Sequence, residues 1–157
     1  MYERAPAAKR IVAARQRAGM SPVEVAGRLG LSSAEYADLE AYDDEAFTSI
    51  SIEMVCRLAD LLGVAPFLLV VPPGASVQPP TPVATARLAS SLDSQMRERS
   101  EQLETLSTRL GWDVEEILSD PRSTWRVCNL DCLQDLCGSV GLSWLGVLAA
   151  WPAERAA

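Results

Sequence analysis

Residues 22–41 combine a small residue, a glycine and spaced apolar side chains in an order that restricts the fold strongly. Ala26 stands where two helices would cross closely, and Gly30 stands where a turn needs a residue that tolerates positive φ. The apolar positions that would seal the corner between the helices are Val25, Leu29, Leu31, Tyr36 and Leu39. The segment therefore predicts two short helices joined by a tight turn.

Signals for the start of a helix fall where this pair of helices needs them. Ser21 with Glu24, and Ser32 with Glu35, have the spacing of capping boxes. Apolar periodicity predicts further helices at residues 5–18, at residues 52–62 before Gly63, and at a short segment that starts at Pro66. We therefore expect residues 1–70 to form a five-helix bundle built around a helix-turn-helix.

A proline-rich segment separates the two halves of the chain. Residues 71–84 contain five prolines, a composition that disfavours both helix and sheet and predicts a stiff linker. Near its end, Thr81 and Pro82 are expected to be the N-cap and first residue of a helix that reaches about Ser100. The linker would leave residues 85–157 as a second helical unit.

The second half repeats features of the first in the same order. The tripeptide Arg-Leu-Gly recurs 81 residues on, at 109–111, and is followed by Asp113 and Glu116 at capping-box spacing. The sequence from Leu130 then follows the one from Ile52 at an offset of 78. Any two helical bundles share some periodicity, but the ordered turn, cap and stop signals favour a duplication. We therefore predict an all-α chain of two five-helix bundles in tandem.

Composition argues against several function classes. The chain has no histidine and no glycine-rich phosphate loop, so nothing assembles a nucleophile with its base, and an enzyme is not expected. The four cysteines are Cys56, Cys128, Cys132 and Cys137. Three of them lie close together and suggest a metal or redox site, but their spacing is not CxxC and a fourth local ligand is lacking. We therefore expect core thiols, with no metal and no cofactor.

Charge and hydropathy bear on location and on partners. The longest apolar run is too short to span a bilayer, and the charged N-terminal segment has no signal-peptide character, so a cytoplasmic protein without a membrane partner is expected. The net charge is −7. From Ser32 to Phe47 every charged side chain is acidic: Glu35, Asp38, Glu40, Asp43, Asp44 and Glu45. Affinity for duplex DNA comes largely from Lys and Arg, so this acidity opposes a DNA-binding function.

The first half resembles the XRE family, the Cro- and phage-repressor-like DNA-binding domains, over residues 8–70. In that family a first-helix arginine and a glutamate that closes the recognition helix form a largely buried ion pair. Arg15 and Glu40 stand at these places, 25 residues apart. At the offset of the repeat they map to Met96 and Pro121, so both charges vanish together. The resemblance implies two phage-repressor-like bundles, of which the second is degenerate.

The resemblance also implies which side chains would meet DNA. The candidates for base and phosphate contacts are Ser32, Ser33, Ala34, Ala37, Asp38, Arg17 and Arg28. None of those on the recognition helix provides the bidentate contact of arginine to guanine or of glutamine to adenine. One hypothesis is a transcriptional regulator that binds double-stranded DNA as a dimer. The alternative is an acidic helix-turn-helix fold that binds another protein, as an antirepressor- or antiactivator-like adaptor does.

All four tryptophans lie in the second half, and Trp112 is expected in its core. Trp144 and Trp151 flank an apolar C-terminal helix that contains Leu148. Such a helix packs across its own bundle or offers a surface for self-association, because aromatic anchors concentrate at the centres of interfaces. Phage-repressor-like proteins commonly dimerise through a C-terminal unit, so the resemblance favours a homodimer with Trp144, Leu148 and Trp151 as candidate contacts.

Overall fold

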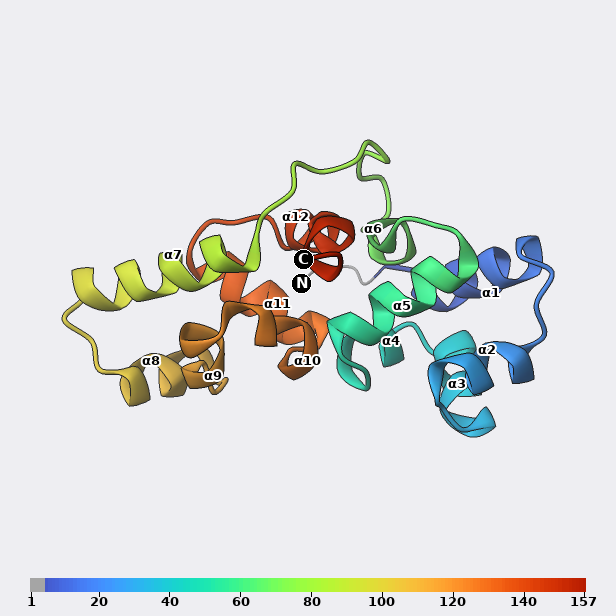
Figure 1. Ribbon diagram of the computed structural model, residues 1–157, viewed down its shortest axis with the longest axis horizontal. Helices are drawn as coiled ribbons and strands as arrows, with labels where there is room; N and C mark the ends of the chain where they lie inside the picture. Colours follow the sequence, from blue (N-terminus) through green and yellow to red (C-terminus); the bar gives the residue numbers. More distant parts are fainter. Residues whose placement is uncertain (1–4) are drawn as a thin grey trace. The chain divides into compact units, whose positions relative to one another are not determined.

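The chain is helical throughout the part that the structure describes. A computed structural model describes residues 5–157, which form helices and connecting segments without a strand (Figure 1). The all-α fold class predicted from the sequence is confirmed. The helices fall into two compact units, with the division between Pro79 and Pro80. Within residues 5–157, every helix is too short or too polar to cross a bilayer.

The first unit contains each helix that the sequence predicts and one more. Its helices are α1 (Ala7–Arg17), α2 (Pro22–Leu29), α3 (Ser33–Ala41), α4 (Glu45–Thr48), α5 (Ile52–Leu62) and α6 (Pro66–Val70). The added helix, α4, is a single turn that buries Ala46 and Phe47. Pro66 is in the first turn of α6, as predicted, because its fixed φ suits that position.

The core of the first unit lies where α1, α2, α3 and α5 meet. Helix α3 packs on both α1 and α2, and α5 packs on α2 and α6. The largest side chains that are fully buried there are Ile11, Tyr36, Leu39, Ile52 and Leu58. Val25 and Leu29 of α2 are buried as the turn pattern predicts, whereas Leu31, between α2 and α3, is only half-buried.

The second unit is more finely divided than the predicted five-helix bundle. Its elements are α7 (Thr85–Glu98), α8 (Leu103–Leu110), α9 (Glu115–Ser119), the 3₁₀ turn η1 (Pro121–Ser123), α10 (Thr124–Val127), α11 (Leu130–Ser139), α12 (Trp144–Ala149) and α13 (Trp151–Arg155). Pro121 ends the helical run after α9 because proline cannot donate the next backbone hydrogen bond. All four cysteines of the chain are buried, as expected of core thiols.

Two predicted helix starts in the second unit are wrong. Helix α7 begins at Thr85 and not at Pro82, because Ala84 is extended and Val83 donates its N–H to the Gly146 carbonyl at 2.8 Å. The carboxylate of Glu154, from the far end of the unit, accepts from both the N–H and the hydroxyl of Thr85 at 2.7 Å. Asp113 accepts from the Glu115 N–H instead of forming a capping box, so α9 begins at Glu115.

Candidate functional site

The turn between α2 and α3 has the geometry that its sequence predicts. Gly30 ends α2 in the left-handed region, with φ of 72°. Ser32 caps α3, since its hydroxyl accepts from the Glu35 N–H at 3.1 Å while the Glu35 carboxylate accepts from the Ser32 N–H at 2.7 Å. These hydrogen bonds lower the pKa of Glu35. The same reciprocal pair, formed by Ser21 with Glu24, fixes the start of α2.

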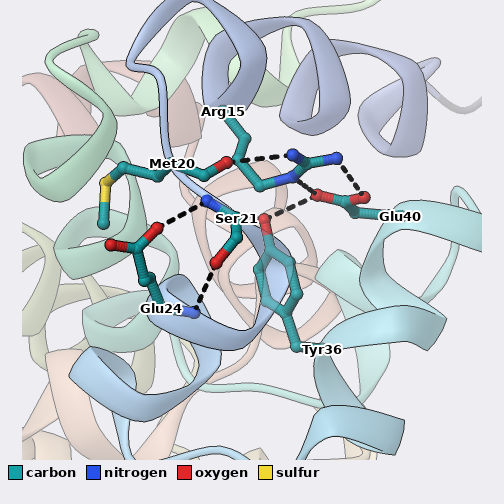
Figure 2. A network of polar contacts seen from close by, with 6 residues as sticks. All are labelled: Arg15, Met20, Ser21, Glu24, Tyr36 and Glu40. Atoms are coloured by element: carbon teal, nitrogen blue, oxygen red, sulfur yellow. Dashed lines mark hydrogen bonds and ion pairs between the residues drawn. The ribbon is translucent and has the colours of Figure 1, made fainter.

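Arg15 and Glu40 join α1 to the end of α3 (Figure 2). The guanidinium makes a two-pronged contact, with Nε on one carboxylate oxygen and Nη2 on the other at 3.0 Å, and Nη1 donates to the Met20 carbonyl at 3.0 Å. The Tyr36 hydroxyl donates to the same carboxylate at 2.8 Å. The ion pair expected from the family resemblance is therefore present. It is mostly but not fully buried, with 13% of the Arg15 and 15% of the Glu40 side chain exposed.

This network decides the protonation state of its members. Burial alone would raise the pKa of Glu40, but the hydrogen bonds from Arg15 and Tyr36 and the charge of Arg15 outweigh it, so the pKa is lowered. Burial and the hydrogen bond to Glu40 raise the pKa of Tyr36. Glu40 is therefore ionised and Tyr36 neutral near pH 7, which suits a donor and an acceptor that hold α3 in place.

The outward face of α3 carries the predicted base-contact residues. The candidates on this face are all exposed: Ser32, Ser33, Ala34, Ala37 and Asp38. These residues begin at the N-cap of α3 and continue along its exposed face, while Tyr36 and Leu39 on the opposite face are buried. The structure thus presents these small side chains together to solvent, on an element that the Arg15–Glu40 pair fixes.

The acidity around α3 is partly used by the fold itself. The Glu40 charge is compensated by Arg15, and Glu35 serves the cap of its own helix. Asp43 accepts from the backbone N–H of Ala8 at 3.0 Å and so caps the first turn of α1. The remaining acids of the segment are Asp38, Asp44 and Glu45. Arg15 therefore balances one of the six negative charges between Ser32 and Phe47, whereas the backbone N–H groups that donate to Glu35 and Asp43 add no positive charge.

The basic residues divide in the same way. Arg10 donates to the Leu68 and Val71 carbonyls at the end of α6, so it serves the fold. Arg17 and Arg28 are exposed, as a phosphate contact requires. The sequence reasoning missed Arg57 of α5, which lines a shallow surface cavity with Arg28. Helical periodicity identified the buried face of α5 but gave no signal that Arg57 would meet α2.

The predicted self-association surface of the second unit is largely inside the fold. Leu148 is fully buried and Trp151 is 7% exposed, so neither is available as an exposed contact. The rings of Trp151 and Trp125 pack edge to face, 5.1 Å apart. The predicted continuous C-terminal helix is divided into α12 and α13. Trp144 and Trp112 are half-buried, and the Trp112 indole donates to Asp135 at 2.9 Å.

The comparisons with known proteins agree with this geometry in the first unit. Residues 8–69 match a family model described as a helix-turn-helix domain. The match runs from the second residue of α1 through α2, α3, α4 and α5 and includes nearly all of α6. Comparison with curated proteins and with solved structures finds no match. The first unit is thus a helix-turn-helix domain, in which α3 occupies the position of the second helix.

Proposed function

We propose that the chain is a cytoplasmic transcriptional regulator of the XRE type, whose helix-turn-helix domain at residues 8–69 binds double-stranded DNA as a dimer. The observation that carries this proposal is the exposed face of α3. Its small side chains sit on a helix whose start is fixed by the capping box of Ser32 and Glu35 and whose end is fixed by the Arg15–Glu40 pair. A rigid second helix with a small, exposed N-terminal face suits entry into the major groove.

The chemistry of each side chain on this face indicates which part of the DNA it could contact. Ser32 and Ser33 can donate to or accept from base edges or phosphates, Ala34 and Ala37 can contact a thymine methyl, and Asp38 can accept from cytosine N4. Arg17 and Arg28 would neutralise phosphates on either side. With two such contacts, the logarithm of the affinity should fall with the logarithm of salt concentration with a slope of about −1.8 for each domain.

The test is a titration of labelled duplexes at several salt concentrations, using random sequence and the promoter of the protein's own transcription unit. Arg17→Ala and Arg28→Ala should each weaken binding to every duplex and reduce the salt slope by about 0.9. Arg87→Ala is the matched control, because Arg87 is an exposed arginine of the second unit. Absence of binding to any duplex at about 50 mM salt would refute the proposal.

The dimer is tested separately by sedimentation velocity. We expect the free protein to sediment as a dimer, or to become one when a palindromic duplex is added, since symmetric half-sites are read by symmetric proteins. A complex with one chain on each duplex at all protein concentrations would refute dimeric binding while leaving DNA binding intact. The dimer contact is not assigned to Leu148 or Trp151, because both are buried.

A second candidate function is a protein-binding adaptor of the antirepressor or antiactivator kind. The observation that favours it is the composition of the helix-turn-helix surface. Val23 on α2 is 68% exposed and Tyr42 at the end of α3 is 58% exposed, and no arginine or glutamine stands on the α3 face. Exposed apolar side chains beside acidic ones fit a basic, partly apolar protein surface better than a phosphate backbone.

Variants separate the two functions. Val23→Ser with Tyr42→Ser should abolish capture of a protein partner in the adaptor, but should leave the affinity of a DNA-binding regulator for duplex at low salt unchanged. Asp38→Asn should raise the affinity of the regulator for random-sequence duplex at low salt, because it removes a negative charge from the surface that would meet the DNA. An unaccompanied protein that binds an operator tightly would exclude the adaptor.

We also propose that the second unit is a degenerate copy of the first. Helix α8 has the span of α2 moved by 81 residues, and Gly111 ends it with φ of 77°. At an offset of 78, α11 and α12 begin where α5 and α6 do. The Asn129 side chain caps α11 by accepting from the N–H of Cys132, three residues later. Ser51 caps α5 in the same way, by accepting from the N–H of Met54. These shared starts, caps and stops support a common scaffold.

The same comparison supports loss of DNA reading in the second unit. Helix α9 spans only Glu115–Ser119, whereas α3 spans Ser33–Ala41. Among the described residues no ion pair corresponds to Arg15 with Glu40, since those positions hold Met96 and Pro121. Its exposed acids make α9 a poor partner for phosphates. We therefore expect Glu116→Gln to leave duplex affinity unchanged, whereas Arg28→Ala weakens it.

A further inference from the structure

Two of the buried thiols in the second unit lie against each other. The Sγ atoms of Cys128 and Cys132 are 3.0 Å apart, and the residues are 1% and 3% exposed. Cys128 ends α10 with extended backbone, and Cys132 lies in the first turn of α11. The chain is held in this course by Asn129, whose side chain accepts from the Cys132 N–H at 2.8 Å. The proximity is therefore built into the joint between the two helices.

From this contact we propose that Cys128 and Cys132 form a reversible intramolecular disulfide, and that this bond is a redox modification site of the second unit. A disulfide requires the sulfurs to approach to about 2.05 Å, a movement of about 1 Å from their present separation. Rotation about the two Cα–Cβ bonds and a small backbone adjustment can supply such a movement. No other function of the chain described above uses these thiols.

The 3.0 Å approach of their Sγ atoms selects Cys128 and Cys132 as the pair. Cys137 lies on the same helix as Cys132, five residues on, which places it about 7.5 Å further along the axis and about 140° around it. These two thiols cannot be bridged while α11 is intact. Cys56 belongs to the first unit. Among the described residues, no group of three or more potential ligands is arranged to hold a metal ion.

The chemistry needs an oxidant, for which a low-molecular-weight disulfide is sufficient. One protein thiol loses its proton, and the thiolate attacks the small disulfide, forming a mixed disulfide and releasing one small thiolate. The second protein thiolate then attacks the protein sulfur of the mixed disulfide and releases the second small thiolate. Two protein thiols are oxidised, the small disulfide is reduced to two small thiols, and each released thiolate takes up one proton.

The surroundings of the pair make the reaction slow. The hydrogen bond with Cys128 and burial raise the pKa of Cys132, and burial raises the pKa of Cys137 to about 12. The thiolate is the attacking species, and the raised pKa of Cys132 leaves little Cys132 thiolate in the closed fold at neutral pH. We therefore expect the bond to form on the timescale of local opening, faster at higher pH, and to be stable once the joint closes again.

The bond would act on the centre of the second unit. Helix α11 packs on α7, α8 and α12, and the cross-link would fix its first turn to the end of α10. Trp125 precedes Cys128 by one turn and contacts Trp151. A change in the α10–α11 joint should therefore alter tryptophan fluorescence as well as thiol count.

The test oxidises the folded full-length protein with oxidised glutathione and then blocks the remaining thiols. Cleavage before Asp120, Asp131 and Asp135 separates the three thiols of this region, giving the fragments 120–130, 131–134 and 135–157. We expect 120–130 linked to 131–134, lighter by two hydrogens, with Cys56 and Cys137 fully alkylated, and we expect a reductant to reverse both the link and the fluorescence change.

Two cysteine variants test the proposal independently, so that poor folding of one does not prevent a result. Cys137→Ala should retain the linked fragments, and Cys132→Ala should lose them while keeping the far-UV circular dichroism of the parent. The proposal would be overturned if the folded protein kept four free thiols under the same oxidised-glutathione treatment that cross-links the urea-unfolded protein. A link from Cys137 or Cys56, or a bond between two chains, would also overturn it.

Discussion

Glu40 accepts hydrogen bonds from two side chains at once, so its removal deprives both donors of their acceptor. Arg15 and Tyr36 reach it from α1 and from one turn earlier on α3. Glu40→Ala should therefore lower the free energy of unfolding by about 2 kcal/mol, less than for a fully buried pair because both partners retain some solvent contact. Urea unfolding followed by far-UV circular dichroism measures the loss.

The control for this prediction is Asp38→Ala, which removes an exposed carboxylate from the same helix and should change stability by less than about 0.5 kcal/mol. The double variant Arg15→Met, Glu40→Leu should lose less stability than Glu40→Ala alone, because it leaves no half-buried charge without a partner. Equal losses in Glu40→Ala and Asp38→Ala would contradict the role of the ion pair.

The pH dependence of the same contact has a definite sign. The pKa of Glu40 is lower in the folded protein than its unfolded value of about 4.3, so its contribution is fully present above that value. Stability should fall as the pH drops from about 4.3 through the lower folded pKa. The stability of Glu40→Ala should depend less on pH in that range, which a set of urea titrations between neutral and acid pH can show.

Two glycines near the end of α2, Gly27 and Gly30, differ in the backbone conformation that they adopt. Gly30 has φ of 72°, whereas Gly27 lies inside α2 with ordinary helical backbone, and a Cβ on either would meet no atom within 4 Å. Gly30→Ala should cost about 1–2 kcal/mol of unfolding free energy because of its left-handed backbone. Gly27→Ala should add about 0.5–1 kcal/mol. Loss of stability in both would show that crowding, not backbone conformation, governs this turn.

The elements that the sequence predicted well are those whose signals are local. The capping boxes of α2 and α3, the stop at Gly63 and the start at Pro66 depend on residues within a few positions of one another. The start of α7 was wrong because its cap is Glu154, 69 residues away. The division of the C-terminal helix was missed because apolar periodicity continues across the break at Ala150.

The candidate site shows the same limit. The exposed face of α3 and the pair Arg15 with Glu40 follow from helical spacing and from the family resemblance. The use of Arg10 by the α6 carbonyls and of Asp43 by α1 did not, because each joins segments far apart in the sequence. The count of charges left for a partner therefore needed the structure.

Helix α12 lies against the segment before α7 at Gly146. A Cβ on Gly146 would lie 2.6 Å from the Thr81 carbonyl oxygen and 2.8 Å from the Val83 side chain. Gly146→Ala should cost about 2 kcal/mol or more, because it forces this segment away and weakens the hydrogen bond from Val83. Gly138→Ala, on α11 with open space around it, is the control and should be neutral or slightly stabilising.

At the scale of the whole molecule, the division between Pro79 and Pro80 predicts two units that unfold separately. All four tryptophans belong to the second unit, so tryptophan fluorescence reports on it alone, whereas far-UV circular dichroism reports on both. Glu40→Ala should shift part of the dichroism transition to lower urea and leave the fluorescence midpoint unchanged. Gly146→Ala should shift the fluorescence midpoint and leave the other part of the dichroism transition in place. If either substitution moved both signals together, the two units would form a single cooperative fold.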